Sequence, residues 1–276
     1  MYVRPRTLDE AVQALEMPGM QILAGGTDFY PAHVGRMVTA PVLDITGIGG
    51  IAGITTATDH VRIGAGATWS QLIATPLPSC FDALKAAARE VGSIQIQNRA
   101  TIAGNLCNAS PAADGVPPLL TLDAEVELLC RAGARRLPLA EFITGNRKTE
   151  RQANEILSAI IVPRTIDGPS AFVKLGARRY LVISIAMVAA VIESDGKGAV
   201  AQARIAVGSC SAVARRLTEL ERRLRSAPCK PGLGGLVQAG HLAALSPIDD
   251  LRATAAYRRD AARTLVARTI EQCVGG

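Results

Sequence analysis

The chain has 276 residues, of which 49% are hydrophobic and 20% charged, and its formal net charge is +6. This length allows one large domain or two ordinary ones, and the composition is that of a soluble globular protein. Only 3% of the residues are aromatic, so stacking platforms for single-stranded nucleic acid are nearly absent and we expect no nucleic-acid partner. The largely apolar run Leu181–Ile192 is too short for a membrane span, which needs about 20 residues, and predicts a buried strand or core segment.

Cysteine and histidine residues are scattered along the chain. The six cysteines show no CxxC or CxH spacing, which indicates no metal site and, in a cytosolic chain, no disulfides. The histidines stand far apart at His33, His60 and His241, so we expect neither a histidine-based metal centre nor a catalytic triad. The opening segment Met1–Glu10 is polar and lacks a signal-peptide pattern. It favours a cytoplasmic protein, with association at the inner face of the membrane left open.

The first 91 residues predict short helices and strands. A capping box, in which Thr7 caps the helix and Glu10 bonds back to the cap amide, begins a short helix, and Thr68 with Gln71 forms a second box. The segments 20–24 and 41–46 are typical of strands, and two segments within 53–66 are expected to pair around Asp59. Residues 80–91 show apolar spacing near 3.6 and predict a helix.

The segment 92–120 has little helical or strand periodicity but many Gly, Asn, Ser and Pro residues. Plain loops of this length are unusual inside a compact domain, so the segment is a candidate functional region. Strands are expected to resume at 124–130 and 155–163.

A composition change near 163–169 suggests a boundary. Beyond it, two apolar runs flank the sequence SDGKG and predict a hairpin. The arginine-rich stretches 213–225 and 250–274 are expected to be helical, with solvated faces or a docking surface for an acidic partner. The whole pattern is α+β in two parts.

Two short segments, AGGTD (24–28) and TIAGN (101–105), have the chemistry to hold a phosphorylated ligand. Their glycines permit positive φ and close backbone approach, so that consecutive amides point at one anion. Thr27 and Thr101 add hydroxyl groups, and Asn105 adds an amide. Taken alone, each segment is a weak signal, since a glycine pair more often marks a plain turn than a ligand contact. Neither matches a P-loop or the GxGxxG fingerprint, but together they would suit a diphosphate.

The order of several motifs resembles one protein family. ILAGGTDFYP, QNRATIAGNLCNASPAADGVPPLLTLDAEVEL, EILSAIIVP, AFVKLGARR and YRRDAARTLVAR follow one another as in the FAD-binding medium subunit of the molybdenum hydroxylases, the xanthine dehydrogenase and aerobic carbon monoxide dehydrogenase family. The resemblance covers essentially the whole chain. It implies a vanillyl-alcohol-oxidase-type FAD-binding domain over residues 1–165, with subdomains of roughly 1–53 and 54–165, and a smaller C-terminal flavoprotein domain over 169–276.

The resemblance also implies which residues contact FAD. The loop that wraps the diphosphate matches Leu23, Ala24, Gly25, Gly26, Thr27, Asp28 and Phe29, and the second phosphate-contacting turn matches Thr101, Ala103, Gly104 and Asn105. Asp114 matches an acid at the ribose or adenine end, Val91 an apolar position packed on the cofactor, and Leu157 and Lys174 positions that line the flavin and nucleotide pocket. Many relatives have Gly-Gly where this chain has Ala103-Gly104, which an alanine tolerates if its φ stays negative.

Several of these residues also have an ordinary structural interpretation. Asp114 alone would be a turn or helix cap before the prolines, Lys174 a surface lysine on a strand, and Leu157 part of the core. Cys107 is expected to pack in the core.

By this resemblance, the chain carries FAD in a complex with a large molybdenum–pterin subunit and a small subunit with two 2Fe–2S clusters, in a dimer of heterotrimers. Electrons would pass from the clusters through FAD to NAD, oxygen, a quinone or a cytochrome. No acid, base or nucleophile is then needed from this chain, because the cofactor performs the chemistry.

Two alternatives remain open from the sequence. The first is a stand-alone flavin-dependent oxidoreductase on the same fold, which would need a catalytic acid near the flavin. The second is a non-catalytic nucleotide-binding protein that has lost its flavin, which the intact glycines and Asp114 argue against.

Overall fold

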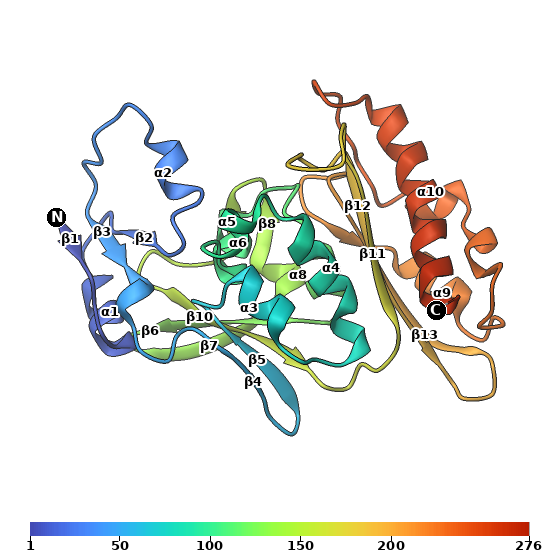
Figure 1. Ribbon diagram of the computed structural model, residues 1–276, viewed down its shortest axis with the longest axis horizontal. Helices are drawn as coiled ribbons and strands as arrows, with labels where there is room; N and C mark the ends of the chain where they lie inside the picture. The colour runs from blue at the N-terminus through green and yellow to red at the C-terminus, as the bar shows by residue number, and fades with distance from the viewer. Residues whose placement is uncertain (276) are drawn as a thin grey trace.

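The chain begins with a small parallel sheet. The computed structural model describes residues 1–275, and Figure 1 shows this sheet at the left, in blue. Its strand order is β1-β3-β2, and all pairs are parallel; the strands are β1 (Tyr2–Val3), β2 (Gln21–Leu23) and β3 (Val42–Asp44). Helix α1 (Leu8–Ala14) connects the first two strands, and α2 (Phe29–Ala32) and the 3-10 turn η1 (Ile45–Gly47) follow β2 and β3. The strands expected at 20–24 and 41–46 are confirmed.

The two capping boxes predicted in the first 91 residues differ in one hydrogen bond. The Thr7 Oγ1 accepts a hydrogen bond from the Glu10 N–H at 3.2 Å, as expected, but the Glu10 carboxylate accepts from the Arg6 N–H instead of the Thr7 N–H. The first capping box is therefore wrong in its second half, because the carboxylate reaches one residue further back. At α3 (Trp69–Ala74), Thr68 and Gln71 form both bonds of the predicted box.

The middle of the chain contains an antiparallel sheet with β10 at its centre. The strand order is β4-β5-β10-β6-β7; the strands are β4 (Ile54–Thr56), β5 (His60–Gly64), β6 (Glu125–Cys130), β7 (Gly133–Pro138) and β10 (Ile156–Pro163). Seven consecutive residues of β10, from Ile156 to Val162, are buried. This burial on both faces explains the continuous apolar run. The strands expected at 53–66, 124–130 and 155–163 are confirmed.

Short helices connect these strands. They are η2 (Ser79–Phe81), α4 (Asp82–Glu90), α5 (Ile94–Gln97), α6 (Ile102–Asn108), α7 (Val116–Thr121) and α8 (Leu139–Phe142), followed by the hairpin β8 (Ile143–Gly145) and β9 (Lys148–Thr149). Residues 92–120 contain α5, α6 and most of α7, three helices that the sequence did not predict. Ser93 and Thr101 cap the first two of these helices, and prolines occupy the first turn of α7. Helices this short depend on caps and tertiary packing, so their sequences show no periodicity.

The last part is a four-stranded antiparallel sheet between two helical layers. Its order is β11-β12-β13-β14; the strands are β11 (Ser170–Leu175), β12 (Ala186–Ser194), β13 (Val200–Gly208) and β14 (Arg215–Arg216). Helices α4 and α7 contact one face, and α10 (Ala255–Val274) covers the other (Figure 1). The predicted hairpin is confirmed, and the Asp195 carboxylate in its loop accepts from the N–H groups of Lys197 and Ala199 at 2.7 and 3.0 Å.

Two expectations in this part need correction. Only the C-terminal portion of the run 181–192 is core, since the side chains of Leu181 and Ile183 are 56% and 51% exposed in the loop before β12. The stretch 213–225 is not one helix. Arg215 and Arg216 form β14 beside β13, and α9 covers only Thr218–Leu224. Two 3-10 turns, η3 (Leu233–Leu236) and η4 (Ala239–Leu242), precede α10.

Charged side chains connect the last sheet to the middle of the chain. The Arg216 guanidinium donates to Asp123 at 2.7 Å and to the Leu120 carbonyl at 3.0 Å, and Arg204 donates to the same aspartate at 3.0 Å. The six cysteines are free, and Cys80, Cys210 and Cys273 are buried. Among residues 1–275, no helix has the length and apolar character to cross a membrane.

Candidate cofactor-binding cleft

A cleft of about 780 Å³ lies between the first sheet and the middle of the chain. Its volume is in the range typical of pockets for small molecules and cofactors. Most of the residues predicted to bind FAD line it: Ala24, Gly25, Gly26, Thr27, Asp28, Phe29, Val91, Thr101, Ala103, Gly104, Asn105 and Leu157. Leu23 does not; it is 5% exposed and packs in the core behind the loop. The structure thus brings AGGTD and TIAGN to one cavity.

The glycine pair lets these two segments touch. A Cβ added at Gly25 would lie 2.0 Å from the Arg99 carbonyl oxygen and 2.9 Å from the Ala100 Cα, so any side chain would push the segments apart. Gly26 adopts φ +79°, which glycine tolerates without strain. Gly25 is therefore required by a close approach of two backbones, and Gly26 is favoured by its positive φ.

The second segment forms the first turn of α6. The Thr101 Oγ1 accepts the Gly104 N–H at 3.0 Å, which caps the helix and leaves the hydroxyl hydrogen free to donate. Ala103 lies inside this helix with a negative φ, so the methyl group in place of the family's glycine causes no backbone strain.

Two polar atoms beside the cleft lack a hydrogen-bond partner among the residues that the structure describes. They are the indole nitrogen of Trp69 and the side-chain oxygen of Asn105, and both residues line the cavity. Both also crowd Gly115, where an added Cβ would lie 2.5 Å from the Trp69 ring and 3.1 Å from the Asn105 oxygen. Buried polar groups in native proteins are nearly always satisfied, so a polar ligand in the cleft fits these atoms.

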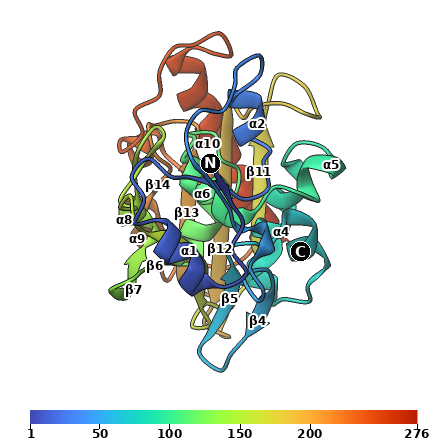
Figure 2. The same ribbon diagram turned by 90° about the vertical axis from the view of Figure 1, so that its left-hand side faces the viewer.

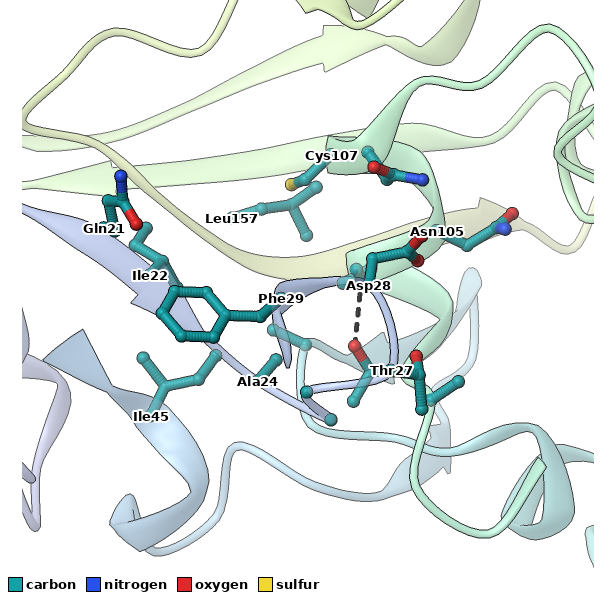
Figure 3. A pocket seen from close by; sticks show the side chains of 18 of the residues that line it. Gln21, Ile22, Ala24, Thr27, Asp28, Phe29, Ile45, Asn105, Cys107 and Leu157 are labelled. Atoms are coloured by element: carbon teal, nitrogen blue, oxygen red, sulfur yellow. Dashed lines mark hydrogen bonds between the residues drawn. The ribbon is translucent and has the colours of Figure 1, made fainter. Parts of the chain in front are cut away.

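One region of the cleft is apolar. In Figure 3, Ile22, Phe29 and Ile45 come from the first layer of the molecule, and Leu157 lies across from them. The Phe29 ring packs on His33 with a centroid separation of 4.7 Å, and the His33 Nδ1 lies 2.7 Å from the Phe29 carbonyl oxygen. Such apolar walls suit the planar ring of a nucleotide or flavin.

Several lining residues were not among those predicted from the sequence. They are Met20, Gln21, Ile22, Ala32, His33, Ile45, Ala65, Trp69, Ile96, Ala100, Cys107, Asn108, Arg147, Arg151 and Ile156. No sequence signal indicates Arg147, which the β8–β9 hairpin brings to the cleft from a distant part of the chain.

Cys107 differs from its expected place in the core. Its side chain is exposed toward the cleft, because it follows the first turn of α6 on the side that faces the cavity. Solvent reaches the side chain from the cleft, but the protein packed around it still desolvates the thiolate. This desolvation raises the pKa of the thiol to about 11. The group is therefore protonated at neutral pH and is a weak nucleophile.

Asp114 and Lys174 lie outside this cleft and pair with each other. The Lys174 Nζ is 2.6 Å from the Asp114 carboxylate, which also accepts the Ser184 hydroxyl at 2.6 Å. Both charged side chains are less than a tenth exposed. Burial raises the pKa of Asp114 above its usual range, and Lys174 and Ser184 partly offset this effect. The contact of these two residues with a cofactor stays a prediction.

The donor set of the cleft fits a dinucleotide. Backbone amides of two glycine-containing segments, two hydroxyls and an amide side chain are chemistry for a diphosphate, and the apolar walls suit a ring system. Asp28 is the acidic residue of this lining, and Arg147 and Arg151 are its basic residues.

Comparisons with known proteins agree with this fit. Residues 1–165 match the model of the FAD binding domain in molybdopterin dehydrogenase, and residues 171–273 match that of the CO dehydrogenase flavoprotein C-terminal domain. The chain is 31% identical to the xanthine dehydrogenase FAD-binding subunit of Escherichia coli O157:H7, over 99% of this chain and 95% of that protein. It is 29% identical to the carbon monoxide dehydrogenase medium chain of Hydrogenophaga pseudoflava, over 98% of this chain and 95% of that protein.

Solved structures show the same fold. A carbon monoxide dehydrogenase from Hydrogenophaga pseudoflava that lacks the Mo-pyranopterin moiety superposes with a TM-score of 0.89 at 28% identity, covering 99% of this chain and 96% of the other. Reconstituted CO dehydrogenase from Oligotropha carboxidovorans gives a TM-score of 0.91 at 26% identity, with 99% and 97% covered. The α+β fold inferred from the sequence is thus confirmed.

Proposed function

Because this chain belongs to the family of FAD-binding medium subunits of the molybdenum hydroxylases, we propose that it carries electrons through FAD within such a complex. In this proposal, 2Fe–2S clusters of a small subunit supply the electrons, a large subunit holds the molybdenum–pterin centre, and an external acceptor reoxidises the flavin. The assembly as a dimer of heterotrimers, the cytoplasmic location and the domain limits given above stay predictions.

One observation carries the placement of FAD. The segments 24–28 and 101–105, which are far apart in the sequence, line one cleft, and Gly25 packs against the backbone of Arg99 and Ala100 just before the second segment. We assign the FAD diphosphate to the space between them and one ring to the apolar walls around Ile22 and Leu157.

The bound FAD would supply the redox chemistry, since flavins accept and release electrons. The chain's own residues have other tasks. The backbone at Gly25 and Gly26 and the side chains of Thr27, Thr101 and Asn105 hold and orient the cofactor, and the apolar walls exclude water. The protein thereby fixes the position of the cofactor relative to its electron donor and acceptor.

The alternative of a stand-alone flavin-dependent oxidoreductase would need a proton-transferring group beside the flavin. Asp28 and His33 are the titratable lining residues other than Cys107 and the two arginines. No contact in the cleft assigns either of them such a task, so the electron-transfer function is favoured.

The test is made on the purified complex. We expect flavin absorbance, release of FAD by acid, and reoxidation of the substrate-reduced complex by one of NAD, oxygen, a quinone or a cytochrome offered in turn. The isolated chain, given the same substrates, should show no turnover. Release of FMN, or turnover by the isolated chain, would contradict the proposal.

A further inference from the structure

We propose that Arg147 binds the diphosphate of FAD and is the cation that neutralises it. This inference rests on the proposed placement of FAD in the cleft. Arg147 was not among the expected cofactor contacts, and it lies at the tip of the hairpin formed by β8 and β9, where it lines the cavity.

The tip of this hairpin has strained backbone and is held by a hydrogen bond to the end of α6. Arg147 has φ +55°, a left-handed conformation that residues other than glycine rarely adopt. Its N–H donates to the Ala109 carbonyl at 2.9 Å, and Ala109, at the end of α6, is itself left-handed with φ +48°. Strained backbone of this kind persists where surrounding contacts enforce it, and it concentrates at functional sites.

The side chain contacts the C-terminal end of α6. The Arg147 guanidinium donates to the Asn108 side-chain oxygen. Asn108 and Asn105 are three positions apart in one helix, so their side chains are neighbours on its surface. The guanidinium therefore lies within about one helical turn of Asn105, one of the residues assigned to the diphosphate.

The charges of the cleft single out the same residue. Of the two lining arginines, Arg151 directs its Nη1 at the carbonyls of Gln152 and Glu155, at 2.9 and 2.7 Å. Within residues 1–275, no carboxylate lies within 4.0 Å of the guanidinium nitrogens of Arg147. The side-chain oxygen of Asn108 accepts from one of these nitrogens, Nη1. A planar guanidinium with free donors is well suited to a diphosphate.

The experiment compares FAD binding to the FAD-depleted complex at low and high salt. Arg147→Met should weaken binding by about tenfold or more and flatten its salt dependence, because it removes a positive charge and charge-assisted hydrogen bonds from the diphosphate. Arg147→Lys should lie in between, since it keeps the charge without the fork. Lys148→Met removes the same charge from the adjacent residue, which does not line the cleft, and should behave like the wild type. Thermal unfolding of each FAD-depleted variant checks that the fold is kept.

Displacement of FAD by ADP and by adenosine identifies the group that Arg147 contacts. If it binds the diphosphate, Arg147→Met should weaken displacement by ADP and leave that by adenosine unchanged. An equal loss with both ligands would place the guanidinium on adenine, and an unchanged FAD affinity with a shifted flavin potential would place it on the flavin. Either result overturns the inference while the proposed function stands. A wild-type chain that binds no FAD would overturn both.

Discussion

The cleft differs in its chemistry from the junction, by which we mean the region where the last sheet meets the middle of the chain. The cleft is lined by glycines, backbone amides, hydroxyls and apolar side chains, with few charges. At the junction, the middle of the chain meets the last sheet through ion pairs: Asp114 with Lys174, and Asp123 with Arg204 and Arg216. A ligand-binding surface needs donors that a ligand can use, whereas a permanent contact satisfies its charges internally. The difference distinguishes the cleft residues proposed to hold FAD from residues whose charges join two parts of the protein.

The largest expected effect concerns the buried pair at the junction. Asp114→Ala leaves the Lys174 ammonium buried without its partner, which should lower the free energy of unfolding by about 3–5 kcal/mol. Asp260→Ala, which breaks the exposed pair with Arg263, is the matched control and should leave stability nearly unchanged. Urea unfolding measures both.

The same variants examine the cofactor contact predicted for Asp114. If the carboxylate acts only at the junction, Asp114→Ala/Lys174→Met should recover much of the lost stability and bind FAD like the wild type, because the double variant leaves no buried charge unpaired. Weakened FAD binding in the stably folded double variant would assign the pair to the cofactor site as well.

The next effect concerns the contact between the two glycine-containing segments. In Gly25→Ala, the added Cβ must move away from the Arg99 carbonyl, so the segments separate. Overpacking costs about 1–3 kcal/mol, which predicts FAD binding weaker by about 10- to 100-fold in fluorescence titrations. Gly235→Ala adds the same methyl where no atom lies within 4 Å, and its FAD affinity should match the wild type. Equal affinities in all three proteins would reduce AGGTD to an ordinary turn.

The smallest effect concerns pH and the segment before α10. The Asp250 carboxylate accepts the Arg252 N–H at 2.7 Å and the Arg258 guanidinium at 2.6 Å, and these bonds lower its pKa to about 2. Since the pKa is lower in the folded state than in the unfolded chain, this stabilisation is present above about pH 4 and is lost as the pH falls toward about 2. Asp250→Asn should cost roughly 1 kcal/mol at neutral pH and flatten the acid limb of the stability profile. An acid limb as steep as in the wild type would contradict this assignment.

The sequence predicts the strands and singles out the two glycine-containing segments because those depend on local chemistry. Gly25, Gly26 and Thr101 are recognisable as residues that free the backbone or cap a helix, and the apolar run of β10 is explained by burial on both faces. The resemblance to a family added the expectation that the two glycine-containing segments contact one cofactor, FAD.

What the sequence could not predict depends on contacts between distant segments. Arg147 reaches the cleft because its hairpin bonds to the end of α6, and Arg216 is a strand residue because β13 and Asp123 hold it there. The short helices in 92–120 are stabilised by caps and packing, so they leave no periodic pattern. The prolines at the start of α7 were a local signal that could have been used.

The burial of the cysteines has a consequence for chemical durability. Desolvation raises the thiol pKa to about 11 in Cys80 and Cys210 and to about 12 in Cys273, and the thiol of Cys107 beside the cleft has a pKa of about 11. Peroxide attacks the thiolate and not the thiol. Because these four thiols stay protonated at neutral pH, we expect them to react slowly with peroxide.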